Sequence, residues 1–156
     1  MRPRRSNGAS RARCRIVLLA SQFHPTIARS LVRGAADTLR RAGVSSEHIQ
    51  TIWVPGAFEL PVVAFRAALA RPRPDAIIAV GALVRGDTIQ YEVLAHAAAQ
   101  GLTRVSLTTG VPVTFGVVVA RTLAQAKARA GGSMGNRGKE AARAALDVLD
   151  TLTRLS

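Results

Sequence analysis

The chain has 156 residues and a formal net charge of +13, and 48% of its residues are hydrophobic, with few aromatics. This composition suits one globular α/β protein and excludes a wholly disordered chain. No apolar run approaches the roughly 20 residues that a membrane-spanning helix needs. The single cysteine, Cys14, excludes an internal disulfide and a cysteine metal cluster, and it fits the reducing cytoplasm.

The first segment, residues 1–13, is expected to be a basic flexible tail that precedes a domain over residues 14–156. Its sequence and the two residues after it hold six arginines and no acidic residue. Pro3 and Gly8 argue against a helix in this segment. Two other interpretations remain open: an arm that becomes ordered on a neighbouring subunit, or an arm that contacts polyanions.

Strands and helices are expected to alternate along the rest of the chain. Short apolar runs predict strands over residues 14–21, 49–54, 75–84 and 111–119. Helical spacing of apolar residues, as at Ile27, Leu31 and Leu39, predicts helices. These helices cover residues 24–43, 55–70, 88–110, 122–131 and 139–155.

This alternation predicts the fold class. The strands at 75–84 and 111–119 are apolar throughout, which is typical of a parallel sheet covered on both faces. Right-handed crossovers then give a three-layer αβα sandwich of flavodoxin-like type with a four-stranded parallel sheet. Ligands of such sheets lie beyond the carboxyl ends of the strands, so four segments should converge there: 21–24, 55–59, 85–90 and 114–116.

Several side chains in or near these segments have chemistry suited to a ligand. Thr88 is expected to begin a helix, whose amide groups and positive dipole end attract anions, and the Arg129 guanidinium matches phosphate. Thr88 could instead be a plain N-cap, and Arg129 a solvated helix charge. Phe23 and Phe115, at expected strand ends, could be ordinary core residues. Glu59 could merely stabilise the helix near whose start it lies, because a carboxylate interacts favourably with the positive end of a helix dipole.

The same segments resemble one family. "SQFH", "VPGAFELP", "GALVRGDT", "TGVPVTFGV" and "ARAGGSMGNRGKEAA" occur in the order and spacing of lumazine synthases. The resemblance covers about Arg15 to Leu152. It implies a cytoplasmic transferase of riboflavin biosynthesis that needs no metal and no redox cofactor. Such an enzyme condenses 5-amino-6-(D-ribitylamino)uracil with 3,4-dihydroxy-2-butanone 4-phosphate to 6,7-dimethyl-8-ribityllumazine, with release of phosphate and water.

The resemblance also implies residues for the pyrimidine substrate. Phe23 would stack on the pyrimidine ring, and Phe115 of an adjacent subunit would close the other side of the ring. Main-chain groups would contact the ring at Ala82, Leu83 and Val84. The ribityl chain would be held by Ala57, Phe58 and Glu59.

The resemblance also implies a second set of residues, which would bind the phosphate of the other substrate. Asp87 and Thr88 would receive the phosphate of the butanone substrate, and Arg129 would neutralise it. Arg137 stands where the family often has a lysine, so that charge is kept, whereas Ser133 replaces another common lysine. Inorganic phosphate is expected to bind the same site.

Gln90 departs from the family pattern, because a histidine assigned to proton transfer is usual two residues after the threonine. Glutamine forms hydrogen bonds but cannot take up a proton at ordinary pH. His96 lies six residues along the same helix and faces elsewhere, whereas His24 lies nearer the expected site and could compensate or be merely solvated. The enzyme is therefore expected to be slow.

Two rival functions are compatible with parts of the sequence. A catalytically weak paralogue could bind lumazine or a flavin, or form a shell. A nucleic-acid-binding protein would explain the charge, but no recognition signature for nucleic acid is present. For assembly, the resemblance implies at least a pentamer, and the short connection "GGSMGNRG" favours a sixty-subunit icosahedral capsid.

Overall fold

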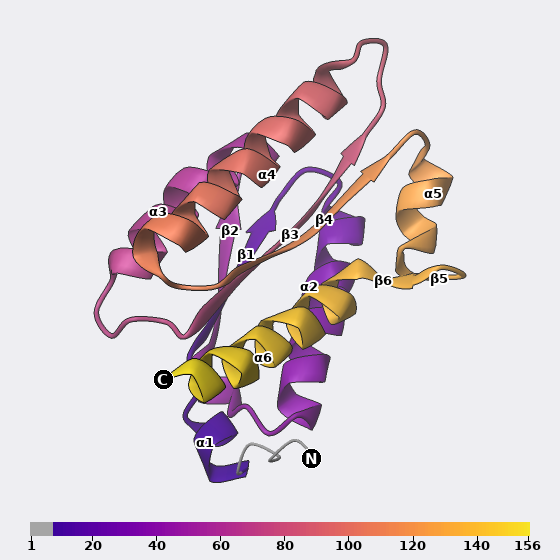
Figure 1. The fold of residues 1–156 in the computed structure, drawn as a ribbon. Coiled ribbons are helices and arrows are strands. Elements are labelled where there is room, and N and C mark those ends of the chain that lie inside the picture. The colour runs from indigo at the N-terminus through magenta and orange to yellow at the C-terminus, as the bar shows by residue number, and fades with distance from the viewer. Residues whose placement is uncertain (1–7) are drawn as a thin grey trace.

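The computed structural model describes residues 8–156, and its centre is one four-stranded parallel sheet (Figure 1). The strands are β1 (Ile16–Ser21), β2 (Ile49–Val54), β3 (Ala76–Val84) and β4 (Val113–Ala120). Their order in the sheet is β2-β1-β3-β4, so β2 and β4 are the edge strands. The predicted four-stranded parallel sheet is confirmed.

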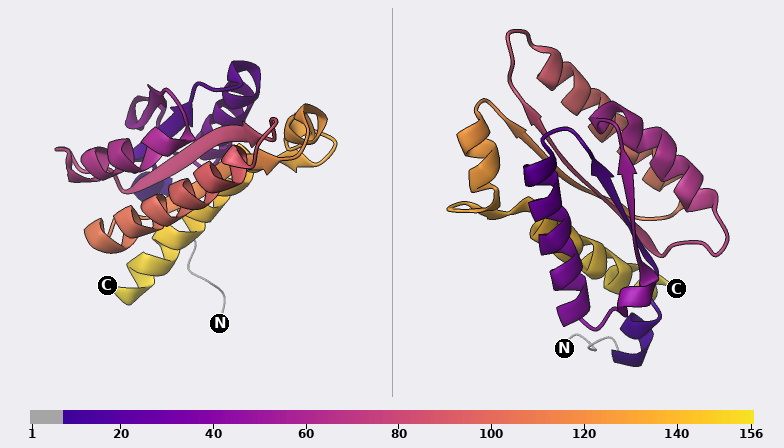
Figure 2. Two further views of the ribbon diagram at one scale, coloured as in Figure 1. Left: turned by 90° about the horizontal axis from the view of Figure 1, so that it is seen from above. Right: turned by 180° about the vertical axis from the view of Figure 1, so that it is seen from behind.

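Helices cover both faces of this sheet. Helices α3 (Leu60–Leu69) and α4 (Gln90–Thr109) lie on one face, and α2 (Pro25–Arg41) and α6 (Arg137–Leu155) lie on the other (Figure 2). The alternation of side chains along β1 divides the core in the same way. Ile16, Leu18 and Ala20 join the core under α2 and α6, while Val17 and Leu19 join the core under α3 and α4. The three-layer αβα sandwich is thus confirmed.

Smaller elements connect these layers: α1 (Gly8–Ala12), η1 (Ser46–His48), η2 (Ala57–Glu59), α5 (Leu123–Ala128), β5 (Ala130–Gly132) and β6 (Gly135–Asn136). Strands β5 and β6 form a short antiparallel hairpin that the sequence analysis did not predict. Gly131 and Gly135 have positive φ angles of 103° and 81°, which glycine adopts without steric cost. Short glycine-rich strands lack the apolar alternation from which a strand is predicted.

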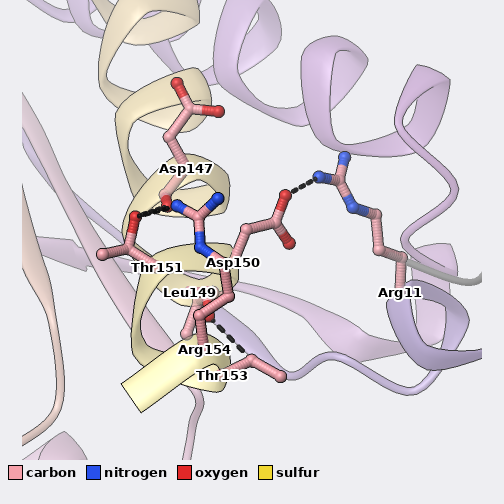
Figure 3. Close-up of polar contacts among 7 residues, drawn as sticks. All are labelled: Arg11, Asp147, Leu149, Asp150, Thr151, Thr153 and Arg154. Carbon is pink, nitrogen blue, oxygen red and sulfur yellow. Dashed lines mark hydrogen bonds and ion pairs between the residues drawn. The ribbon is translucent and has the colours of Figure 1, made fainter. Parts of the chain in front are cut away.

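The N-terminal segment differs from its prediction. Gly8–Ala12 forms a short helix, so the expectation of no helix is wrong for this part, although the first seven residues of the predicted tail lie outside the described residues. Arg11 of α1 pairs with Asp150 of α6 at 2.6 Å, as Figure 3 shows. This long-range contact fixes α1 against the C-terminal helix, which local propensity does not reveal.

Beneath α1, Cys14 is half-buried and free. Burial, followed by the nearby Asp75 carboxylate, raises the pKa of the Cys14 thiol to about 12. The thiol therefore stays protonated and unreactive at neutral pH.

Candidate functional site

The carboxyl ends of β1, β2 and β3 lie side by side and carry the first part of the candidate site. The Gln22 amide donates to the Val54 carbonyl at 2.8 Å, which joins the loops that follow β1 and β2. Phe23, the next residue, is 66% exposed. Its ring is therefore available for contact with a ligand or with another copy of the chain.

The loop after β2 folds into η2, which packs against both β3 and α4. Ala57 is buried there, whereas Phe58 is 61% exposed and Glu59 is half-buried. Within residues 8–156, the Glu59 carboxylate has no hydrogen bond or ion pair, and it does not cap α3. Its acceptor oxygens are therefore not used by the fold.

The end of β3 supplies main chain rather than side chains. Ala82 and Leu83 are buried in opposite cores, and Val84 is half-buried. The Arg85 amide donates to the Ala120 carbonyl at 2.9 Å, so the ends of β3 and β4 stay joined. A ligand at this end of β3 can meet only main-chain groups of these residues and the exposed loop beyond them.

That loop contains Asp87, Thr88 and Gln90, and all three are exposed. The prediction that Thr88 begins the helix is wrong by two residues, because α4 starts at Gln90 with Ile89 as its N-cap. The Thr88 hydroxyl accepts a hydrogen bond from the Gln90 amide at 3.3 Å, so it occupies one of the free amides of the first turn. The Glu92 amide donates to the Ile89 carbonyl at 3.0 Å, so it too is used by the fold, while the positive dipole end of α4 still faces this loop.

The residues that follow β1, β2 and β3 and are candidates for ligand contact form the loop group: Phe23, Ala57, Phe58, Glu59, Asp87, Thr88 and Gln90. The predicted convergence of the segments 21–24, 55–59 and 85–90 agrees with the strand order, since β1 lies between β2 and β3.

The fourth predicted segment, 114–116, does not join them. Phe115 is the third residue of β4, and it pairs with Ala79 in the middle of β3 rather than with a strand end. The strand predicted over 111–119 agrees with β4, which ends at Ala120, but placing 114–116 at its carboxyl end was wrong because Phe115 lies inside that strand.

Phe115 belongs to a second place on the molecule. It lines a cavity of about 290 Å³ beside the edge strand β4, together with Arg129 and Arg137. Phe115 is 40% exposed there. These three residues are the edge-strand group. One chain thus presents an aromatic ring and two guanidinium groups at a site separate from the loop group.

The two arginines of the edge-strand group differ in how the fold uses them. The Arg137 amide donates to the Arg129 carbonyl at 2.8 Å, which brings the two residues together. The Arg137 guanidinium also pairs with Glu140 at 2.7 Å, one turn along α6. Among the described residues, Arg129 has no ion pair, so its charge is the more available for a bound anion.

The three histidines occupy different regions. His24 lies at the N-cap of α2 in the left-handed region, with φ 53°, and is the one non-glycine residue of positive φ in the described part of the chain. Its ring meets the Phe23 ring edge-on at 5.5 Å between centroids. His48 Nδ1 lies 2.8 Å from the Ala12 carbonyl near the other end of the sheet, and His96 is exposed on α4. His24 is therefore the histidine of the loop group's neighbourhood.

One buried polar atom near the site was not anticipated from sequence. Ser21 ends β1, and within residues 8–156 its hydroxyl has no hydrogen-bond partner although it is fully buried. A Cβ on Gly81, in the adjacent β3, would lie 2.0 Å from this oxygen. A hydrophobic pattern does not show whether a polar side chain at the end of a strand is buried, so the sequence does not predict this unpaired hydroxyl.

The described residues provide neither a cluster of metal ligands nor a membrane-spanning helix. No group of three or more histidine, cysteine, aspartate or glutamate side chains is arranged to hold a metal ion in residues 8–156. No helix in that range combines the length and apolar character needed to cross a membrane.

Comparison with known proteins gives the family. The sequence profile of 6,7-dimethyl-8-ribityllumazine synthase matches residues 13–153. Proteins of that name are 49% identical in Gemmatimonas aurantiaca, over 90% of this chain and 85% of the relative, and 45% identical in Halorhodospira halophila, over 90% of each. A third, from Protochlamydia amoebophila, is 40% identical over 93% of this chain and 84% of its own length. With most of the described fold covered by these matches, the chain belongs to the 6,7-dimethyl-8-ribityllumazine synthase family.

Proposed function

We propose that this chain is a lumazine synthase, a transferase that joins 5-amino-6-(D-ribitylamino)uracil to 3,4-dihydroxy-2-butanone 4-phosphate and releases 6,7-dimethyl-8-ribityllumazine, phosphate and water. The observation that carries the proposal is the family match over residues 13–153, which includes every residue of the loop group and the edge-strand group. A cytoplasmic location is part of the proposal and rests on the single cysteine of the sequence.

The chemistry asks mainly for orientation. The aromatic amine attacks the ketone carbon, and loss of water gives an imine. Phosphate then leaves with the electron pair of its C–O bond, and the ring closes with loss of water. Orientation alone can lower such a barrier by about 7–11 kcal/mol. A site that holds both substrates in line can therefore be active with weak acid–base help.

The loop group is proposed to hold the pyrimidine. Phe23 offers an exposed ring face for stacking, and main-chain groups at Ala82, Leu83 and Val84 contact the heterocycle. The ribityl hydroxyls donate to Glu59, whose carboxylate has no other partner in the described fold. Ala57 and Phe58 contact the same ribityl chain. The exposure of Phe23 and Phe58 in one chain supports this, since a substrate or a second copy would cover them.

The phosphate is proposed to lie at the start of α4. Main-chain amides at Asp87 and Thr88 and the dipole of α4 favour an anion, while the Asp87 carboxylate must turn away from it. Arg129 neutralises the phosphate, and Arg137 adds charge at longer range. Inorganic phosphate competes with the butanone substrate for these groups.

A complete site is proposed to need two copies of the chain. Phe115, Arg129 and Arg137 line one cavity beside the edge strand, separate from the loop group. A head-to-tail contact sets the loop group of one copy against the edge-strand group of the next, and such a contact closes into a ring. We propose a pentamer, and a sixty-subunit shell because the connection between the last two helices, α5 and α6, is short and rich in glycine, which the family resemblance associates with a shell.

Gln90 occupies the position proposed for proton transfer. It is exposed as the first residue of α4 and can orient a water or the phosphate by hydrogen bonds. It cannot itself carry a proton, so the phosphate or a water carries it in this enzyme. A low turnover follows, since one acid–base group is typically worth on the order of 10²–10⁴-fold in rate.

An assay with both substrates tests the function. The full chain is incubated with the pyrimidine and the butanone phosphate, and formation of the lumazine is followed by its absorbance. Product formation above the uncatalysed rate supports the proposal. Calorimetric binding of the pyrimidine without any product formation would instead identify a binding protein that has lost catalysis.

A further inference from the structure

A second cationic site lies on the opposite side of the sheet from α3 and α4. A cavity of about 370 Å³ opens between α1, α2 and α6. Arg11 of α1, Arg41 of α2, and Lys139 and Arg143 of α6 line it, with Asp147 as the acidic residue of the lining. We refer to this cavity as the α2–α6 pocket. None of its residues belongs to the loop group or the edge-strand group.

The walls of the pocket are held in place by close helix contacts. A Cβ on Gly138 of α6 would lie 2.1 Å from the Leu31 carbonyl oxygen of α2, so only glycine permits this approach. The Asn136 amide group donates to the Ser30 carbonyl at 3.1 Å and fixes the start of α6 on α2. The backbones that carry the cations of both helices are therefore held at a fixed separation, which supports a binding site.

The third wall is tied down as well. The Arg11 guanidinium pairs with Asp150 at 2.6 Å, as the close-up in Figure 3 shows. This ion pair positions α1 at the base of α6, at the edge of the pocket. Arg11 is itself half-buried, so the pair is partly shielded from water.

Lys139 is placed where a helix does not favour a cation. It lies in the first turn of α6, at the positive end of the helix dipole. Arg143 follows four residues later, so the two like charges stand on one face of α6 and repel each other. Among the described residues, neither side chain has an ion pair, in contrast to the nearby Arg137, which pairs with Glu140. These cations lower helix stability unless an anion offsets them.

The chemistry of the lining defines the class of ligand. Guanidinium forks and an ammonium group match the oxygens of a phosphoryl group. The lining contains no aromatic residue, so a base or sugar ring would find no stacking surface. Thr38 adds little, because its hydroxyl already donates to the Gly34 carbonyl at 2.8 Å.

We propose that the α2–α6 pocket binds a phosphoryl group, presented either by free inorganic phosphate or by the backbone of a nucleic acid. This site is distinct from the proposed substrate site and goes beyond the proposed function. Binding is independent of base sequence and weakens with salt. An occupied pocket also cross-links α1, α2 and α6, so it stabilises the folded chain.

The test is a calorimetric titration of inorganic phosphate at constant ionic strength in chloride buffer. The full-length chain carries Arg129→Ala, which weakens the proposed substrate phosphate site. Into this background we introduce Arg143→Gln, Lys139→Gln or, as a matched control, Arg154→Gln. Arg154 lies on the same helix, carries the same charge and does not line the pocket. Circular dichroism verifies that each variant is folded.

The expected result is saturable phosphate binding that weakens at least tenfold in Arg143→Gln and in Lys139→Gln but not in Arg154→Gln. A short single-stranded DNA oligonucleotide is then titrated by fluorescence anisotropy. If it binds more tightly than phosphate and loses affinity in Arg143→Gln and in Lys139→Gln but not in Arg154→Gln, the phosphoryl group comes from nucleic acid. If phosphate binds and the oligonucleotide does not, the ligand is free phosphate. Either outcome supports the pocket.

Three results would overturn the proposal: no saturable binding of either probe, an equal loss with Arg143→Gln and Arg154→Gln, or a fall in kcat/KM in Arg143→Gln with Arg129 intact. The second would show diffuse surface charge, and the third would place the pocket within the substrate site. Failure of the synthase assay in the wild type leaves the first two readouts intact, because they measure binding and not catalysis.

Discussion

The loop group and the edge-strand group carry different functional groups, and the proposed reaction needs both sets. The loop group lies at the carboxyl ends of β1 to β3, with exposed aromatic rings, an unpaired carboxylate at Glu59 and a helix start at Gln90. The edge-strand group lies beside β4 and carries an aromatic ring and two arginines. Neither set of residues alone contains all the side chains that are proposed to bind the butanone phosphate and the pyrimidine.

This difference indicates what a single chain lacks. A protein that worked alone would bring Phe23 and Glu59 of the loop group and Arg129 of the edge-strand group into one cleft. Here the strand order keeps Phe115 in the middle of an edge strand, away from Phe23. In the proposed shared site, the exposed rings of both groups would be covered by a substrate or by a neighbouring copy.

The largest effect is expected from separating the two groups. Val93 of α4 is 51% exposed, one turn after Gln90. We expect Val93→Asp to break the assembly and lower activity at least about a hundredfold, because an unpaired charge buried in an interface costs several kcal/mol.

Ala144→Asp is the matched control, since it adds the same charge at an exposed position of α6. Light scattering and the lumazine assay are read together. Full activity of Val93→Asp as a monomer would show that one chain holds a complete site.

The next effect distinguishes the substrates served by the two groups. Arg129→Ala is expected to raise KM for the butanone phosphate by about 10- to 100-fold, since a hydrogen bond to a charged group is worth about 1.5–3 kcal/mol. KM for the pyrimidine, which carries no phosphate, should change little. Equal weakening of both substrates would remove Arg129 from the phosphate site.

Proton transfer is a property of the loop group alone. Gln90→His should raise kcat about tenfold, which is less than the usual 10²–10⁴-fold of an acid–base group because phosphate and water already carry protons. His96→Gln, on the same helix, should leave kcat unchanged. A wild-type rate already typical of the family, with no gain from the histidine, would refute the role of this position.

The smallest effect is expected within the edge-strand group. Arg137→Gln should raise KM for the butanone phosphate only a few-fold, because Glu140 already pairs with Arg137 at 2.7 Å. Glu140→Gln frees that arginine and should lower KM slightly. Steady-state kinetics of both variants measures these changes in KM. A larger rise in KM for Arg137→Gln than for Arg129→Ala would contradict the expectation that Arg129 contributes more to phosphate binding.

Much of the fold follows from patterns visible in the sequence. The apolar run at 49–54 coincides with β2, and the helical spacing after His24 predicts α2. The apolar run at 111–119 also agrees with β4, but it does not show which side chains of an edge strand line a cavity with distant residues, as Phe115 does with Arg129 and Arg137. Nor could they reveal α1, since Arg11 meets Asp150 across 139 residues of chain.

The most direct test of a site shared between copies is complementation. Glu59→Ala removes a residue of the loop group and Arg129→Ala one of the edge-strand group, and each variant alone should have little activity at substrate concentrations below the wild-type KM. When equal amounts assemble together, about a quarter of the interfaces pair an intact loop group with an intact edge-strand group. The shared site predicts that the mixture regains about a quarter of wild-type activity. A mixture no more active than the two variants measured separately would contradict it.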